Sequence, residues 1–291
     1  MRPAGGILVF GKTGQVATEL ARQAQVTSLG RDQGNLCDPA ACGALIDTMR
    51  PSAVINAAAY TNVDGAEDHE DLATTINGNA PTAMALAAAR ANIPFIHISS
   101  DYVFDGSGTQ PRDEGATPRP LNAYGRSKLL GERGVADAGG PHVILRTSWV
   151  FSATGQNFVK TMLRLADTNS QLRVVADQFG GPTAAGDIAS ACLSIVRALN
   201  AGKGASGVFH FSGAPDVSWA DFARQIFAQE NRDVVVKDIP SHQFPTRAQR
   251  PLNSGLDCRA ITRTFGIHRP DWQASLQSVL NELKVENHDQ S

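Results

Sequence analysis

The chain has 291 residues, of which 42% are hydrophobic and 19% charged, a composition typical of a folded globular protein and unlike that of disordered or fibrous chains. Its net charge of −2 and the absence of any Lys/Arg block argue against a nucleic acid partner, because binding to phosphates requires an excess of positive charge. No apolar run approaches the roughly 18 residues of a membrane-spanning helix, so no membrane partner is expected, and four cysteines without a CxxC pair fit a cytoplasmic protein with reduced thiols.

The first predicted element is a buried strand at Ile7 to Phe10, followed by the turn Gly11-Lys-Thr-Gly14-Gln-Val-Ala17 and an amphipathic helix. The GxxGxxA spacing is typical of a dinucleotide-binding turn, because the glycines let the backbone approach a pyrophosphate and the small alanine lets the helix pack closely on the sheet. Gly-Lys-Thr also resembles part of the phosphate-binding loop of nucleotide hydrolases, but here the strand itself occupies the residues after Gly6. We therefore predict a dinucleotide cofactor.

The end of the second predicted strand, Val26 to Leu29, bears on which dinucleotide binds. An Asp or Glu usually binds the adenine ribose hydroxyls of NAD at this point, whereas this chain has Gly30 and Arg31. A guanidinium accommodates the 2′-phosphate of NADPH, so the sequence favours NADPH. The neighbouring Asp32 weakens this preference, and NADH stays the alternative.

The next predicted elements continue to alternate between strands and helices. We predict strands at Ala53–Ala58, Phe95–Ser99 and His142–Arg146, and helices at Ile76–Arg90 and Leu121–Glu132. This alternation predicts an α/β protein with a doubly wound parallel sheet of the Rossmann type.

Two short segments follow predicted strands, where ligands bind to parallel sheets. Asn35 and Leu36 begin a loop that either flanks the adenine or is a solvated turn. Ser99 and Ser100 end a strand, and their hydroxyls either reach the ligand crevice or cap the following loop.

Tyr124 and Lys128 lie four residues apart on the predicted helix Leu121 to Glu132, so their side chains share one face. A free tyrosine has a pKa of about 10, and a nearby ammonium group would lower that pKa by favouring the phenolate. A bare YxxxK spacing is most often a surface Tyr and Lys that meet only through helical geometry. Here a nucleotide-binding turn and a strand-end hydroxyl precede it, and this order predicts hydride transfer to or from a carbonyl.

Beyond about Ser152 the alternation loosens, and we expect a second, smaller unit there. The predicted division is a dinucleotide-binding domain at 1–150 with returning segments near 184–212, and a mainly substrate-binding C-terminal domain at 151–183 and 213–291.

Two features of this C-terminal part have competing interpretations. A predicted helix at Trp219 to Gln229 has Trp219, Phe222 and Ile226 on one stripe, which we interpret as core and not as a binding site. Arg247 and Arg250 flank a turn; their guanidinium groups suit a diphosphate, and a solvated loop is the alternative.

A series of segments resembles the successive motifs of one enzyme family: GKTGQVA, INAAAYTNVDGAE, SSDYVFDG, NAYGRSKLLGE, LRTSWVFS, NFVKTMLRLA, DQFGGPT and RPLNSGLD. They run from about residue 5 to 285 and resemble the dTDP-4-dehydrorhamnose reductase family of extended-type short-chain dehydrogenase/reductases. The resemblance implies reduction of the C4 keto group of a dTDP-keto sugar, dTDP-4-dehydro-L-rhamnose, by NADPH or NADH. The product, dTDP-L-rhamnose, would serve cell-surface polysaccharide synthesis.

The resemblance also implies roles for individual residues. The catalytic residues would be Ser100, which is often Thr in the family, with Tyr124 and Lys128. With Arg31 from the argument above, the cofactor residues would be Gly11, Gly14, Gln15, Val16, Arg31, Asn35, Leu36, Ala59, Tyr60, Thr61, Tyr124 and Lys128. The substrate residues would be Ser100, Asp101, Trp149 and Arg250, the last near the diphosphate.

Some members of the family form dimers around a magnesium ion held by glutamates. Glu19 matches one such position, but Gly186 stands where a second glutamate would be, so we predict no metal ligands and leave a homodimer open.

Two other functions compete with reduction. The chain could be a noncatalytic NADP-binding regulatory subunit, which the intact Ser/Tyr/Lys trio argues against, or a nucleotide-sugar epimerase or dehydratase. Dehydratases usually place acidic residues directly after the strand-end hydroxyl, and SSDYVF offers only Asp101.

Overall fold

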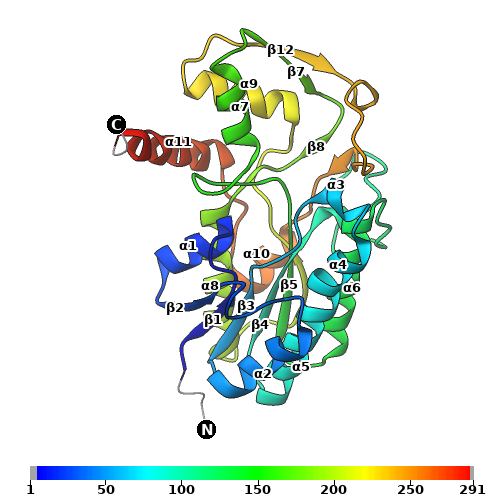
Figure 1. The fold of residues 1–291 in the computed structure, drawn as a ribbon, viewed down its shortest axis with the longest axis vertical. Coiled ribbons are helices and arrows are strands. Elements are labelled where there is room, and N and C mark those ends of the chain that lie inside the picture. Colours follow the sequence, from blue (N-terminus) through cyan, green and yellow to red (C-terminus); the bar gives the residue numbers. More distant parts are fainter. Residues whose placement is uncertain (1–4, 289–291) are drawn as a thin grey trace.

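The computed structural model describes residues 5–288 and is built around a six-stranded sheet of order β10-β5-β4-β3-β1-β2 (Figure 1). Every neighbouring pair is parallel. The strands are β1 (Ile7–Phe10), β2 (Val26–Leu29), β3 (Ala53–Asn56), β4 (Phe95–Ser100), β5 (His142–Thr147) and β10 (Gly207–His210). From β1 the chain adds β2 on one side and then β3 and the later strands on the other side. This change in the order of strands leaves a crevice at the carboxyl ends of β1 and β3. The predicted doubly wound sheet is confirmed.

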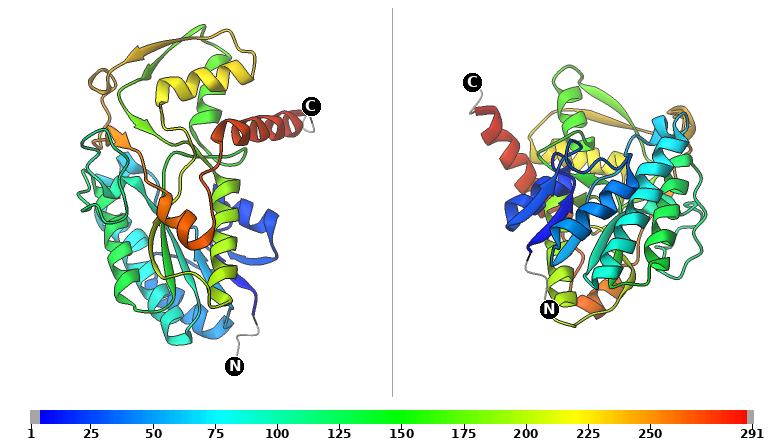
Figure 2. Two further views of the ribbon diagram at one scale, coloured as in Figure 1. Left: turned by 180° about the vertical axis from the view of Figure 1, so that it is seen from behind. Right: turned by 60° about the horizontal axis from the view of Figure 1, so that its bottom comes forward.

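Helices cover both faces of this sheet (Figure 2). One face carries α1 (Gln15–Gln23) and α8 (Ala185–Asn200), and the other carries α2 (Pro39–Met49), α5 (Ala80–Ala91) and α6 (Ala123–Asp137). Alternate residues of each strand therefore enter two different cores, as Val9 and Phe10 do from β1. This burial on both faces explains the continuous apolar runs of the strands.

The helical segments that follow β3 differ from the predicted pattern. Helices α3 (Val63–Ala66) and α4 (Glu70–Thr74) follow β3, and the predicted helix at Ile76–Arg90 begins as a π-helical segment, Thr75–Asn79, before α5. The predicted strand at Ala53–Ala58 ends at Asn56, because the chain leaves the sheet there and lines a cavity.

The remaining residues form a smaller layer at the carboxyl edge of the sheet, at the top of Figure 1. Its helices are α7 (Phe158–Ala166), α9 (Trp219–Gln229) and α11 (Trp272–His288), with α10 (Arg259–Phe265) packed near β10. Its strands are β6 (Val150–Phe151), β7 (Gln171–Val175), β8 (Phe179–Gly180), β9 (Thr183–Ala184), β11 (Val217–Ser218), β12 (Val235–Ile239) and β13 (Asn253–Ser254). Short 3₁₀ turns lie at Asp101–Val103 and Ser241–Gln243. Phe222, Ile226 and Trp272 belong to a third core within this layer, and the functional division into two domains stays a prediction.

No helix within residues 5–288 is long and apolar enough to cross a bilayer.

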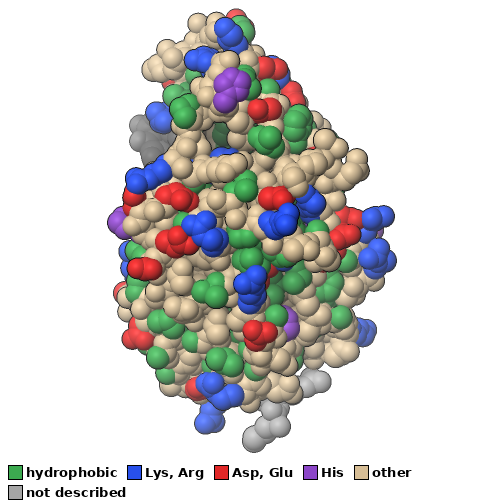
Figure 3. Space-filling view, turned by 90° about the vertical axis from the view of Figure 1, so that its right-hand side faces the viewer, with side chains coloured by type: hydrophobic (Ala, Val, Ile, Leu, Met, Phe, Trp, Pro, Cys, Tyr) green, Lys and Arg blue, Asp and Glu red, His purple; other side chains and the backbone are tan. Residues whose placement is uncertain are grey.

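Acidic and basic side chains are interspersed on the face shown in Figure 3. The four cysteines are free thiols; Cys37 is exposed, and Cys42, Cys192 and Cys258 are buried.

Candidate active site

A cavity of about 810 Å³ opens at the carboxyl ends of β1, β3, β4 and β5. Every residue predicted to bind the cofactor lines it, from Gly11 in the first turn to Lys128 on α6. The predicted substrate residues Ser100, Asp101 and Trp149 line it as well, whereas Arg250 does not. Thus the structure brings residues from the first 150 positions together around one space, and their individual roles stay predictions.

The glycine turn is shaped to approach a pyrophosphate. Gly11 has φ +118°, and a Cβ there would lie 3.2 Å from the Ala17 Cβ and 3.3 Å from the Ala57 carbonyl carbon, so only glycine fits. Helix α1 starts directly after Gly14, and no side chain caps its first amides. Free amides at a helix start are a ready anion site, so this turn fits the diphosphate of a dinucleotide.

Two cations lie at the end of β2. Arg31 and Lys12 both line the cavity and are exposed, and a Cβ at Gly30 would lie 3.6 Å from the Lys12 Cδ. Within residues 5–288 neither side chain forms an ion pair. The sequence analysis considered Lys12 only as part of a hydrolase-like motif and missed this proximity, which depends on the fold of the turn.

The loop after this strand answers the question left open for Asn35. The Asn35 Oδ1 accepts a hydrogen bond of 3.1 Å from the backbone N–H of Cys37, so its side chain shapes a turn. Leu36 is buried and lines the cavity. The loop is therefore both a turn and a wall of the candidate adenine site.

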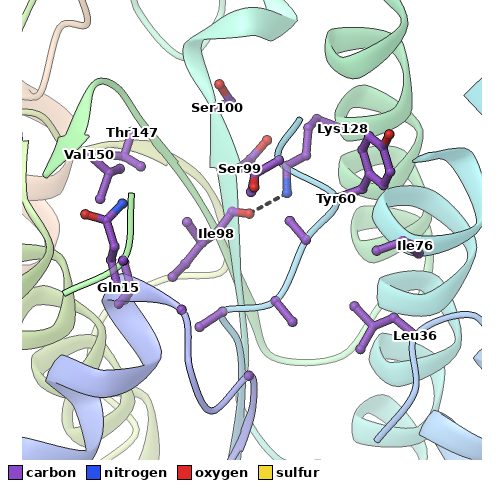
Figure 4. A pocket seen from close by; sticks show the side chains of 18 of the residues that line it. Gln15, Leu36, Tyr60, Ile76, Ile98, Ser99, Ser100, Lys128, Thr147 and Val150 are labelled. Atoms are coloured by element: carbon purple, nitrogen blue, oxygen red, sulfur yellow. Dashed lines mark hydrogen bonds between the residues drawn. The ribbon is translucent and has the colours of Figure 1, made fainter. Parts of the chain in front are cut away.

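The three candidate catalytic residues come from β4 and α6 and all line the cavity, and Figure 4 shows two of them, Ser100 and Lys128. Ser100 is the last residue of β4, and its Oγ donates to Asp101 Oδ1 at 2.9 Å and accepts from the Tyr102 backbone N–H at 3.2 Å. Lys128 is 2% exposed, and its Nζ donates to the Ile98 carbonyl oxygen at 2.7 Å. The Tyr124 ring packs edge-on against Tyr102, with ring centroids 5.6 Å apart.

The electrostatics of this trio differ from the sequence-based prediction. Burial raises the pKa of the Tyr124 phenol, the nearby Asp101 charge raises this pKa further, and a hydrogen bond with Ser100 opposes the rise. Lys128 is not among the causes, so the prediction that its ammonium lowers the pKa of Tyr124 is wrong for this structure. A raised pKa keeps the phenol protonated at neutral pH, which is the state that a proton donor requires.

Asp101 is 3% exposed and sits between two serine hydroxyls. Ser100 and Ser254 both donate to its carboxylate, yet burial dominates and raises the pKa of Asp101 from 3.8 to about 6. Its charge state therefore changes over a pH range in which most carboxylates are already ionised.

This raised pKa predicts a pH-dependent stability. The folded state holds the Asp101 proton more tightly than the unfolded state, so its contribution is fully present below pH 3.8 and is lost as pH rises through about 6. Asp101→Asn should abolish this loss when the free energy of unfolding is measured by denaturant titration between about pH 4 and about pH 7. Asp105→Asn is the control, because hydrogen bonds from Ser107 lower the pKa of Asp105 from 3.8, so its contribution is lost only at lower pH and this variant should keep the wild-type slope above about pH 4. Equal pH slopes for wild type and Asp101→Asn would contradict the assignment.

Trp149 and Trp219 form a stacked pair, with centroids 3.5 Å apart and planes 11° apart, and both line the cavity. A Cβ at Gly180 would lie 2.8 Å from Trp149, so glycine leaves room for this ring. Trp219 packs against the third core, as predicted, and Phe222 and Ile226 on the same stripe are fully buried, but Trp219 also lines the cavity, which the prediction did not include. Trp219 is the first residue of α9, and its half-buried ring stacks on Trp149 at the cavity wall.

Arg250 lies outside the cavity and has another partner. Its guanidinium pairs with Asp64 at 2.7 Å and lies 5.9 Å from the Tyr102 ring centroid. Arg247 pairs with Asp68. The turn at 247–250 therefore contacts the region of α3 through two ion pairs, and a diphosphate role for Arg250 requires Asp64 to release it.

Asn77 is a residue that the sequence analysis missed. Its Oδ1 accepts from the Tyr60 backbone N–H at 2.8 Å, and its Nδ2 donates to the Tyr60 carbonyl and to Ser127 Oγ, both at 3.0 Å. It thereby fixes the loop at Ala59 to Thr61 against α6. The sequence offers no signal that separates Asn77 from the neighbouring Asn79, because Asn77 is buried and Asn79 exposed only as a result of the fold.

The position discussed for a metal has other contacts. Glu19 accepts from Arg22 at 3.0 Å, and a Cβ at Gly186 would lie 3.6 Å from Glu19 Oε2. Across residues 5–288, no group of three His, Cys, Asp or Glu side chains is arranged to hold a metal ion.

Comparisons with known proteins agree with this architecture. The family model described as RmlD substrate binding domain matches residues 5–285. The dTDP-4-dehydrorhamnose reductase of Sinorhizobium fredii is 44% identical, covering 97% of this chain and 99% of that protein.

Two crystal structures extend this similarity to the whole fold. The dTDP-4-dehydrorhamnose reductase of Clostridium acetobutylicum superposes with a TM-score of 0.90 at 34% identity, covering 96% of this chain and 99% of that one. The Bacillus anthracis dTDP-4-dehydrorhamnose reductase, in complex with NADP, gives a TM-score of 0.89 at 31% identity with the same coverages.

Proposed function

Because the chain belongs to the dTDP-4-dehydrorhamnose reductase family, we propose that it reduces the C4 keto group of dTDP-4-dehydro-L-rhamnose to dTDP-L-rhamnose with a nicotinamide cofactor. The observation that carries the proposal is the placement of Ser100, Tyr124 and Lys128 around the cavity that the glycine turn enters. The product would serve cell-surface polysaccharide synthesis.

The side chains divide the work of the reaction between them. When bound, the reduced nicotinamide supplies the hydride that the ketone carbon receives. Tyr124, held protonated by its burial, donates a proton to the ketone oxygen, and the Ser100 hydroxyl orients that oxygen. Lys128 holds the cofactor ribose and places a positive charge beside the developing negative charge.

One assay tests the proposed reaction. NADPH absorbance should fall when purified protein is mixed with enzymatically prepared dTDP-4-keto-L-rhamnose, in proportion to the sugar reduced. An epimerase or dehydratase would recycle its cofactor without net oxidation, and a noncatalytic regulatory subunit would consume none. Either result would overturn the reductase proposal.

For the cofactor, we propose a preference for NADPH over NADH, supported by Arg31 and Lys12 at the end of β2, which form no ion pair with any residue in the described range 5–288. Arg31→Ala should raise the KM for NADPH by about tenfold, the lower end of the effect of a hydrogen bond to a charged group, because Arg31 is exposed. The KM for NADH should change less, and it serves as the internal control in steady-state assays. An equal rise in both KM values would place Arg31 away from the 2′-phosphate.

We also propose that the protein works in the cytoplasm. Its four free thiols, one of them exposed, suit a reducing compartment. A homodimer stays a prediction.

A further inference from the structure

Helix α6 carries a buried carboxylate one turn beyond Lys128. Glu132 is 4% exposed and receives two hydrogen bonds from Arg146, from Nε to Oε1 at 2.9 Å and from a terminal nitrogen to Oε2 at 2.6 Å. Ser99 of β4 donates to the same Oε1 at 2.6 Å. A charged residue of the helix is therefore tied to both β4 and β5 with all its contacts inside the protein.

The arrangement extends to the edge strand β10. The second terminal nitrogen of Arg146 lies 3.3 Å from His210 Nε2, while His210 Nδ1 lies 2.9 Å from the Arg112 carbonyl oxygen. Burial and the Arg146 charge lower the pKa of His210 to about 3, so the ring is neutral and accepts from Arg146. Arg146 also lies over the Phe104 ring, 4.9 Å from its centroid. Its position is thus fixed on several sides.

Helix α6 also packs closely against its neighbours through glycines. A Cβ at Gly125 would overlap the Tyr102 carbonyl oxygen, one at Gly131 the Asn77 carbonyl oxygen, and one at Gly134 the Thr82 hydroxyl. The helix is thereby held by these close contacts as well as by the hydrogen bonds of Glu132. Tyr124 and Lys128 both depend on this helix for their distance from Ser100 on β4.

We propose that Glu132 is a positioning residue for the reduction: through Ser99 and Arg146 it sets how α6 lies on the sheet, and, four residues beyond Lys128 on the same helical face, its negative charge favours the Lys128 ammonium. This inference rests on the proposed function, because it assigns Glu132 a part in the same reaction. Glu132 itself lies outside the cavity lining and acts only through its neighbours.

The groups around Lys128 support the electrostatic part of the proposal. Burial lowers the pKa of Lys128 to about 8, and the Glu132 charge opposes this fall. His97 on β4 is fully buried, and desolvation together with the Lys128 charge holds the pKa of His97 well below its ordinary value, so it is neutral. Other titratable groups near Lys128 are Asp101, Tyr60 and Tyr124, which line the same cavity, and Arg146 and His210, which continue the contacts of Glu132. Glu132 is the one carboxylate that acts on the Lys128 pKa in the described chain.

Three variants separate positioning from simple stability. Glu132→Gln keeps the shape of the side chain and removes its charge, which leaves the buried Arg146 guanidinium without its carboxylate partner. Glu132→Gln combined with Arg146→Met also removes that guanidinium. The control is Glu70→Gln, which breaks the exposed ion pair between Glu70 and Arg126 on the same helix.

In Glu132→Gln, the alkaline limb of the kcat profile should move to lower pH by at least about one unit, the shift expected when an opposite charge is lost nearby. The kcat near pH 8 should then fall by about fivefold and recover as the pH is lowered, with a smaller change in KM. The double variant should be more thermally stable than Glu132→Gln but keep the shifted pH profile of kcat. Glu70→Gln should match wild type in thermal stability and in the pH profile of kcat.

A second readout is independent of turnover. The Lys128 pKa can be followed by ¹³Cε NMR titration of the ligand-free protein, with the resonance assigned from Lys128→Arg, and it should fall in Glu132→Gln. An unshifted pKa, or a double variant with both stability and kcat profile restored, would overturn the role of Glu132. If wild type shows no reductase activity, the proposed function fails while this titration still decides whether Glu132 controls Lys128.

Discussion

Tyr124→Phe is expected to lower kcat by about 10²- to 10⁴-fold, the usual contribution of a positioned general acid. The phenol is buried and its pKa is raised, so at neutral pH it carries the proton that the ketone oxygen needs. Phenylalanine keeps the ring and its edge-on contact with Tyr102 but has no proton to give. Stopped-flow or steady-state oxidation of NADPH with the dTDP-keto sugar measures the loss.

The same variant should bind NADPH with nearly unchanged affinity, measured by fluorescence titration, because the hydroxyl acts on the substrate and not on the cofactor. Tyr102→Phe is the matched control, since it removes the other hydroxyl of the packed tyrosine pair, 5.6 Å away between ring centroids. Its kcat should fall by less than about tenfold. Near-normal turnover of Tyr124→Phe, or an equal loss in both variants, would remove Tyr124 from the proton transfer.

The local parts of the site were predictable from the sequence because each depends on neighbouring residues. The strand at Ile7–Phe10, the following glycine turn and the four-residue spacing of Tyr124 and Lys128 are set by hydrophobic pattern, backbone freedom and helical geometry. Parallel strands also place Gly11 and Ser100 at one edge of the sheet, so their meeting around one cavity follows from the fold class.

What the sequence did not reveal depends on contacts between distant segments. Arg250 pairs with Asp64, which is 186 positions away, and no local pattern indicates that partner. Trp219 has the spacing of a core residue, but as the first residue of α9 it stacks on Trp149 at the cavity wall. The direction of the Tyr124 pKa shift also failed, because it is set mainly by burial, which becomes known only when the sheet and α6 are packed together.

The buried Lys128 ammonium is expected to lower the stability of the folded protein while serving the reaction. It is buried with a single hydrogen-bond acceptor among the described residues, the Ile98 carbonyl, and burial lowers its pKa from 10.5 to about 8. A charged group in this position costs free energy, since water no longer solvates it. Glu132 remains paired with Arg146 when Lys128 is replaced, so the replacement leaves no other buried charge without a partner.

Lys128→Met should therefore be inactive and at the same time more stable than wild type. At pH 7 the free energy of unfolding should rise by up to about 4 kcal/mol, the range seen when buried charges are replaced by apolar side chains of similar volume, less the lost hydrogen bond to Ile98. Unlike Tyr124→Phe, this variant should also bind NADPH more weakly, because the ammonium is assigned to the cofactor ribose.

The stability difference between Lys128→Met and wild type should change with pH in a defined direction. The folded pKa of Lys128 lies below the ordinary value, so between about pH 8 and pH 10.5 the unfolded chain binds more protons and wild-type stability rises with pH. Lys128→Met lacks this rise, so its advantage should be largest below pH 8 and shrink towards pH 10.5 in denaturant titrations. A variant that is less stable than wild type at pH 7, or whose advantage does not change with pH, would show that the buried amine is held at no cost and that its neighbours stabilise the charge in full.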